Sequence, residues 1–185
     1  TGLTLRQKDP TIKLTGYDKD KVVRNRAKKI GLCKVESNLD NAVSGSQLII
    51  LCVPVGQMQA VTQRIKKIIE PGTTITDVGS VKLSVIEEIE SNIESVGGKY
   101  VPSHPIAGTE RSGPDAGYAG LFEGRWCILT PTKKTNKKAL NSLETFWKFL
   151  GMQTKIMTPE HHDLVLAVTS HAPHLIAYTT VSYTH

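Results

Sequence analysis

The sequence lacks several features that would each point to a particular class of protein. It contains no run of about 18 apolar residues, so it predicts no membrane-spanning helix. Residues 1–6 lack the basic and apolar segments of a signal peptide. The chain also lacks an initiator methionine, so we expect the natural N-terminus to lie further upstream.

Cysteine is scarce, and the three cysteines, Cys33, Cys52 and Cys127, lie far apart. An odd, widely spaced set does not suggest a disulfide framework, and no CxxC or Cys-His metal spacing occurs. We therefore expect a reduced, cytoplasmic protein. Cys52 lies inside an apolar run, which predicts a buried side chain.

Aromatic residues make up only 5% of the sequence, although its net charge is +6. Nucleic-acid-binding surfaces typically combine a basic stripe with aromatic side chains. The densest basic group, at positions 133, 134, 137 and 138, has no aromatic beside it and is typical of a solvated loop and helix start. We expect no nucleic-acid partner, whereas a basic balance can attract an anionic small molecule.

The sequence does contain a regular alternation of apolar strands and amphipathic helices. We expect strands at residues 13–18, 48–53, 73–78, 99–102, 126–130 and 154–157. We expect helices at residues 19–30, 58–69, 81–89 and 140–150, and a long helix that begins with Thr158 and Pro159. Residues 1–9 are typical of the body of a further helix. This order predicts an α/β fold with a doubly wound, mostly parallel, Rossmann-like sheet.

Ligands of doubly wound sheets bind at the carboxyl ends of the strands, and three predicted strand ends carry suggestive residues. Asp18 can accept hydrogen bonds from a ribose diol and would repel a 2′-phosphate, which favours NAD over NADP. The alternative interpretation is that Asp18 is a solvated turn residue. The other two ends are residues 54–56 (PVG) and 77–82 (DVGSVK). No GxGxxG phosphate-binding motif occurs, and its place in such a fold would be upstream of Thr1.

Residues 103–113 (SHPIAGTERSG) concentrate reactive side chains in a Gly- and Pro-rich segment, which predicts a loop. Such a loop contributes little to a core, and loops of this kind are often held over active sites. His104 is the candidate catalytic residue, because a neutral imidazole can accept a proton near neutral pH.

Five sequence blocks resemble one enzyme family. They are residues 77–82 (DVGSVK), 104–113 (HPIAGTERSG), 121–124 (LFEG), 129–132 (LTPT) and 170–174 (SHAPH). Over nearly its whole length the chain resembles the prephenate and arogenate dehydrogenases of tyrosine biosynthesis. The resemblance implies a dinucleotide-binding domain at residues 1–157 that lacks its first strand and glycine-rich loop. It also implies that residues 158–185 begin an all-helical domain that forms a homodimer.

The resemblance implies oxidation of a cyclohexadienol, in which hydride passes to NAD⁺ or NADP⁺ and CO₂ leaves as the ring becomes aromatic. The first expectation is a prephenate dehydrogenase that uses NAD and forms 4-hydroxyphenylpyruvate. Arogenate dehydrogenase is the alternative, since the two substrates differ only in a side-chain ketone or amine. An inactive cofactor-binding fragment and a β-hydroxy-acid dehydrogenase are further alternatives, although the latter typically uses a catalytic lysine.

By the same resemblance, His104 polarises the ring hydroxyl and Ser80 contacts both the substrate hydroxyl and the cofactor. Ser80 also suits a plain helix N-cap, and the two roles are compatible. The implied substrate-binding residues are Thr109, Glu110, Ser170, His171 and His174. The implied cofactor-binding residues are Asp18, Val53, Pro54, Val55, Gly79 and Ser80.

A metal site is not expected, although several histidines lie close together in the C-terminal part of the sequence. No HExxH motif is present, and no cysteine joins these histidines. His161 and His162 are adjacent, so on a helix they point in different directions.

Overall fold

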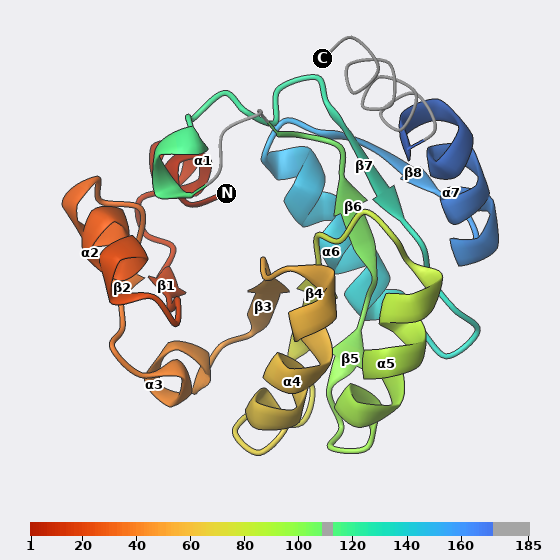
Figure 1. The fold of residues 1–185 in the computed structure, drawn as a ribbon, viewed down its shortest axis with the longest axis horizontal. Helices are drawn as coiled ribbons and strands as arrows, with labels where there is room; N and C mark the ends of the chain where they lie inside the picture. The colour runs from red at the N-terminus through yellow and green to blue at the C-terminus, as the bar shows by residue number, and fades with distance from the viewer. Residues whose placement is uncertain (109–112, 172–185) are drawn as a thin grey trace, which may run out of the picture.

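Strands and helices alternate along the chain, as the sequence predicts (Figure 1). The computed structural model describes residues 1–108 and 113–171, and it describes Ser170 and His171 by their backbone alone. The helices are α1 (Gly2–Lys8), α2 (Lys21–Lys29), α3 (Leu39–Val43), α4 (Val55–Ile65), α5 (Leu83–Glu94), α6 (Lys137–Phe149) and α7 (Pro159–Leu166), with the short helical turns η1 (Pro114–Ala116) and η2 (Ala167–His171). The strands are β1 (Thr15–Gly16), β2 (Lys34–Val35), β3 (Leu48–Leu51), β4 (Thr74–Asp77), β5 (Lys99–Tyr100), β6 (Ser103–Pro105), β7 (Trp126–Leu129) and β8 (Gln153–Ile156).

Most strand pairs are parallel, which confirms the predicted α/β class. β1 pairs with β2, and β4 lies between β3 and β5, all in parallel. In the sheet β6–β7–β8, β7 and β8 are parallel but β6 runs antiparallel to β7. The chain passes from the sheet β3–β4–β5 to the sheet β6–β7–β8 between two consecutive residues. Val101 N donates to Ile75 O in β4, whereas Pro102 O accepts from Thr130 N, which follows β7.

In the part of the chain that the structure describes, β1 and β3 are not paired with each other, so β3 lies at the edge of its sheet (Figure 1). The apolar run of β3 predicted a strand buried on both faces. Leu51 is buried, but Leu48 and Ile50 are only half-buried. The prediction that Cys52 is buried is wrong: its side chain is exposed, because it follows an edge strand.

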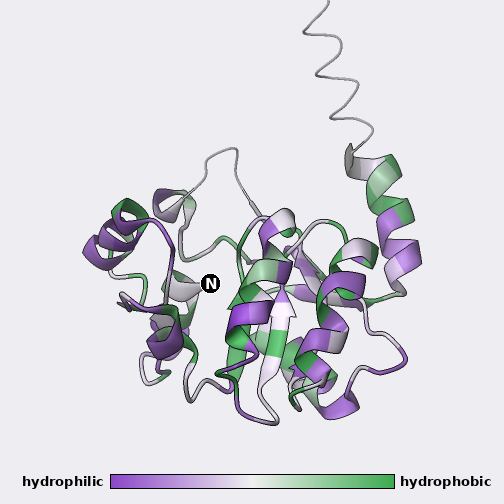
Figure 2. Cartoon of the chain, turned by 60° about the horizontal axis from the view of Figure 1, so that its bottom comes forward, coloured by the Kyte–Doolittle hydropathy of each residue, from purple (hydrophilic) through white to green (hydrophobic). Residues whose placement is uncertain are grey.

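Two apolar cores hold helices on opposite sides of the sheets, with α4 and α5 in front and α6 behind in Figure 1. Met58 and Ile65 of α4 pack with Ile89 of α5 in the first core. Leu143 and Trp147 of α6 belong to the second core. By contrast α2 is hydrophilic over most of its surface and has no buried residue (Figure 2).

Helix ends follow the expected chemistry. The side chain of Thr158 accepts a hydrogen bond from His161 N, and Pro159 occupies the first turn of α7. Gly31 and Gly151 follow α2 and α6 with φ angles of +68° and +100°, a region that favours glycine. Across the described ranges, every helix is too short or too polar to span a bilayer.

Candidate active site

His104 lies on a strand and not in the loop that the sequence predicts. It is the central residue of β6 and pairs with Ile128 of β7, and its side chain is half-buried. The pairing continues one residue further, where Ile106 N donates to Trp126 O. Sequence reasoning missed β6 because a three-residue strand that ends in proline has too short a pattern to detect. The imidazole therefore projects from a backbone that a neighbouring strand holds in place.

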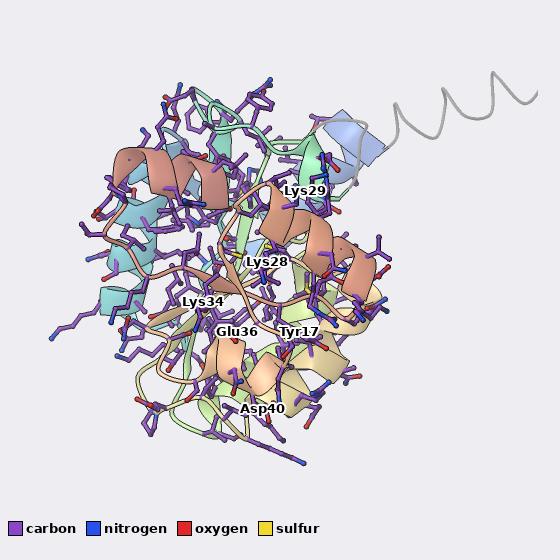
Figure 3. The ribbon with its side chains drawn as sticks, turned by 90° about the vertical axis from the view of Figure 1, so that its left-hand side faces the viewer. Tyr17, Lys28, Lys29, Lys34, Glu36 and Asp40 are labelled. Atoms are coloured by element: carbon purple, nitrogen blue, oxygen red, sulfur yellow. The ribbon has the colours of Figure 1, made fainter. Side chains whose placement is uncertain are left out.

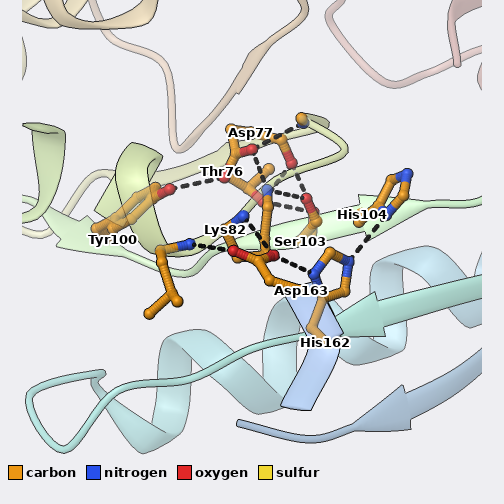
Figure 4. Close-up of polar contacts among 10 residues, drawn as sticks. Thr76, Asp77, Lys82, Tyr100, Ser103, His104, His162 and Asp163 are labelled. Atoms are coloured by element: carbon orange, nitrogen blue, oxygen red, sulfur yellow. Dashed lines mark hydrogen bonds and ion pairs between the residues drawn. The ribbon is translucent and has the colours of Figure 1, made fainter. Parts of the chain in front are cut away.

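The His104 imidazole contacts a second imidazole, which comes from α7 (Figure 4). His104 Nδ1 lies 2.9 Å from His162 Nε2, and the two rings meet edge to face with centroids 5.1 Å apart. His162 Nδ1 in turn lies 2.7 Å from Asp163 Oδ1. His162 is fully buried, whereas the adjacent His161 is exposed. Two imidazoles and a carboxylate thus form a continuous row.

The Asp163 carboxylate also holds the start of α5. Its Oδ1 accepts from Lys82 N at 2.8 Å, and its Oδ2 accepts from Leu83 N at 2.9 Å. Carboxylates are stabilised at helix N-termini by these amides and by the helix dipole. The suggestion that Ser80 caps this helix is therefore wrong, because Asp163 takes that role and Ser80 lies exposed in the preceding loop.

The electrostatics of the row favour an ionised Asp163 beside a neutral His162. Burial lowers the pKa of His162, and the nearby Lys82 ammonium lowers it further. The hydrogen bond with Asp163 raises this pKa but offsets the lowering only partly. Burial alone would raise the pKa of Asp163. The hydrogen bonds from Leu83 N, the His162 ring and Lys82 N outweigh that effect and lower it.

A buried ammonium joins the end of β4 to the strand of His104. Lys82 is fully buried, and its Nζ forms an ion pair with the equally buried Asp77. The same Nζ donates to Ser103 O at 2.8 Å, one residue before His104. Burial lowers the pKa of Lys82, although the Asp77 carboxylate opposes the shift. One side chain therefore ties β4 to β6.

The Asp77 carboxylate orders the loop that carries Ser80. Its Oδ1 accepts from Gly79 N at 2.8 Å, and its Oδ2 accepts from the Tyr100 hydroxyl at 2.6 Å. A Cβ on Gly79 would stand 3.0 Å from Asp77 Oδ1, so a side chain at this position would crowd the carboxylate. Ser80 thus projects from a loop that is fixed from within the protein.

Asp18 follows β1, where its exposed carboxylate accepts from Asp20 N at 2.8 Å. The guanidinium of Arg24 donates to the carbonyls of Asp18 and Lys19, at 2.6 and 3.0 Å. It also lies over the ring of Tyr17, 5.5 Å from the centroid. Figure 3 looks onto this charged side of the molecule. The turn after β1 is therefore ordered while the Asp18 side chain stays open to solvent.

The structure brings the predicted cofactor-binding residues to one edge of the sheets. Lys19 Nζ donates to Gln57 Oε1 at 3.1 Å, which joins the Asp18 turn to α4. A Cβ placed on Gly79 would lie 3.4 Å from Val55 Cγ2, so the turns after β3 and β4 are in contact. Val53 is half-buried and Pro54 exposed in that first turn. These contacts fit a nucleotide that crosses the strand ends.

Some predicted substrate residues fall outside this description. Thr109, Glu110 and His174 lie outside the described residues, and Ser170 and His171 are placed by backbone alone, in η2. Within residues 1–108 and 113–169, no three His, Cys, Asp or Glu side chains come together as a metal site. Sequence reasoning missed the roles of Lys82, His162 and Asp163.

The chain is similar to proteins of one enzyme family. The family described as prephenate dehydrogenase, nucleotide-binding domain, matches residues 1–156. A cyclohexadienyl dehydrogenase of Zymomonas mobilis is 41% identical over 173 residues, or 93% of this chain and 58% of that protein. A prephenate dehydrogenase of Bacillus subtilis is 33% identical over 187 residues, or 99% of this chain and 50% of that protein.

Solved structures agree with these sequence matches. A prephenate dehydrogenase from A. aeolicus, in complex with hydroxyphenyl propionate and NAD⁺, has a TM-score of 0.91 and 32% identity. That match covers 98% of this chain and 63% of the other. The chain therefore spans between half and two thirds of the length of these relatives.

Proposed function

This chain belongs to the prephenate dehydrogenase family, and we propose that its protein oxidises prephenate to 4-hydroxyphenylpyruvate and CO₂ with hydride transfer to NAD⁺. The observation that carries this proposal is the setting of His104. Its half-buried imidazole projects from β6, and Lys82 ties that strand to the loop of Ser80. A base held beside the loop that follows β4 in a nucleotide-binding domain fits proton removal next to hydride transfer.

The reaction requires three bond changes in the substrate. The carbinol C–H leaves as hydride, the hydroxyl loses its proton, and the bond from the ring to the carboxylate breaks as CO₂ departs. Bound NAD⁺ supplies the hydride acceptor. His104 accepts the hydroxyl proton, because neutral imidazole is a base near neutral pH. The same proton returns to the phenolate oxygen of the aromatic product, so His104 ends the cycle neutral.

Ser80 is the second residue that we assign to the reacting centre. Its side chain is exposed at the end of β4, on the loop that Asp77 and Lys82 order. A serine hydroxyl both donates and accepts hydrogen bonds. Ser80 therefore orients the substrate hydroxyl toward His104 while its neighbour Gly79 lies along the cofactor. Thr109, Glu110, Ser170, His171 and His174 stay as predicted substrate contacts.

The proposed domains are a dinucleotide-binding domain at residues 1–157 and the start of a helical, homodimer-forming domain at residues 158–185. The separation of β1 from β3 supports the first, because one further parallel strand between them would complete a Rossmann sheet and carry the glycine-rich loop. Leu164 of α7 and Val168 of η2 are 64% and 65% exposed, which supports a helical partner for this C-terminal segment. The free cysteines suit a cytoplasmic protein.

Steady-state assays of the full-length protein test the proposed activity. We expect the highest kcat/KM for prephenate with NAD⁺, measured as reduced nicotinamide, with equimolar release of CO₂. A higher kcat/KM for arogenate would favour the alternative substrate. Absence of cofactor reduction with both substrates would overturn the proposed function.

We predict that Asp18→Ala weakens NAD⁺ use without impairing the chemical step. Loss of hydrogen bonds from the ribose diol to a carboxylate should raise the KM for NAD⁺ about 10- to 100-fold, following roughly 1.5–3 kcal/mol for a charged hydrogen bond. Because repulsion of the 2′-phosphate also disappears, the KM for NADP⁺ should fall. Initial rates with each cofactor measure both changes.

Asp40→Ala is the matched control for this substitution. Asp40 is another exposed carboxylate, on α3, and the cap of that helix comes from the side chain of Asn38. We expect both KM values to stay at those of the parent protein. An unchanged preference for NAD⁺ in Asp18→Ala would show that another group selects the cofactor.

A further inference from the structure

We propose that His162 and Asp163 set the tautomer of His104, so that Nδ1 carries the proton and Nε2 is the nitrogen that accepts one. Both are positioning residues that act through His104. The identity of the accepted proton rests on the proposed function, but the tautomer itself follows from the hydrogen bonds of the row (Figure 4).

Asp163 is the acceptor in each of its contacts. Its carboxylate accepts two backbone N–H groups at the start of α5, those of Lys82 and Leu83. An ionised carboxylate has no proton to donate. His162 Nδ1, 2.7 Å from Asp163 Oδ1, is therefore the donor in that contact and carries a hydrogen.

His162 is neutral in this environment. Among the described residues, the titratable groups that face it are Asp163, His104, Lys82 and Asp77. Burial together with the Lys82 ammonium outweighs the two carboxylates, so the pKa of His162 is lowered. A neutral imidazole that carries its hydrogen on Nδ1 has an acceptor at Nε2. His104 Nδ1, 2.9 Å away, must then donate. In neutral His104 this leaves the lone pair on Nε2.

The row also stabilises His104 after it takes up a proton. Its imidazolium keeps the Nδ1–H bond to His162, and the positive charge is stabilised through His162 by the Asp163 carboxylate. The opposite polarity would place a hydrogen on His104 Nε2 and prevent it from acting as a base. Asp163 also accepts hydrogen bonds from the backbone at the start of α5. The packing of α7 against α5 and the tautomer of His104 therefore depend on the same carboxylate.

Nitrogen-15 NMR of the histidine side chains in the full-length protein tests the proposal directly. The chemical shifts of Nδ1 and Nε2 distinguish the two neutral tautomers, so we expect His104 to be mainly Nδ1–H at neutral pH. His162→Phe removes the acceptor and should return His104 toward the Nε2–H form. His162→Gln keeps an acceptor oxygen and should restore part of the Nδ1–H population. His161→Phe, the same change at the adjacent exposed position, should leave the spectrum of His104 unchanged.

Kinetics of the full-length protein provide the second readout. His162→Phe should lower kcat roughly 10- to 100-fold with a smaller change in KM, because the reactive tautomer becomes a minority and the ring is less well held. An Nε2–H tautomer in the parent chain would overturn the proposal even if His162→Phe does not fold. Since the NMR experiment needs no substrate, a failure of the proposed reaction would leave its outcome intact.

Discussion

Replacing His104 by Asn should lower kcat about 10²- to 10⁴-fold, the range typical of a lost general base, while the KM for prephenate changes only a few-fold. Asparagine cannot accept the hydroxyl proton at neutral pH, so the barrier to hydride departure rises. Ground-state binding is largely preserved, because the other substrate and cofactor contacts that we assign lie on residues besides His104. Steady-state kinetics of the full-length protein measure both constants.

The structural cost of this substitution should be small. His104 is half-buried, and its backbone pairing with Ile128 in β6 and β7 does not depend on the side chain. The unfolding midpoint and NAD⁺ affinity should therefore stay close to those of the parent protein. A His104→Asn variant with parental kcat would contradict the assignment of the base. A variant that loses NAD⁺ affinity would instead point to a structural role.

Replacing Lys82 by Met should lower the free energy of unfolding by about 3–5 kcal/mol, because it breaks a buried ion pair from one side. The Asp77 carboxylate would remain fully buried with hydrogen bonds from Gly79 and Tyr100 but no cation. The bond to Ser103 O would also be lost. Urea unfolding followed by circular dichroism measures the change.

Two further variants serve as controls for the effect of Lys82→Met on stability. Lys148→Met removes an exposed lysine from its ion pair with Glu144 on α6, and such surface pairs contribute only about 0–1 kcal/mol. The double variant Asp77→Asn with Lys82→Met removes both charges and should recover part of the lost stability. A loss below about 1 kcal/mol in Lys82→Met would show that the buried pair is not what holds this part of the protein together.

The order of the secondary structure could be predicted because each signal is local. Alternating apolar runs, the Thr158–Pro159 helix start and the glycines after α2 and α6 each depend on a few neighbouring residues. β6 and the exposure of Cys52 could not be predicted in this way. The first depends on pairing with β7, and the second depends on which strands flank β3.

Candidate site residues could be proposed from the sequence only where the residues of a motif are adjacent. His104 and Ser80 stand in such motifs, which the family resemblance identifies. His162 contacts His104 across 58 positions, and Asp163 reaches Lys82 across 81. One signal was available, since Pro159, His162 and Leu166 share the buried face of α7 and therefore set His162 apart from His161. Without the packing of α7 against β6, that signal does not say what His162 contacts.

A structure of the full-length protein with NAD⁺ and 4-hydroxyphenylpyruvate would test the central claim most directly. The measured quantity is the distance from His104 Nε2 to the phenolic oxygen of the product. We predict a hydrogen bond of about 2.6–3.2 Å, with the Ser80 hydroxyl also in contact with that oxygen. A phenolic oxygen bound out of reach of His104, against a different side chain, would contradict the account.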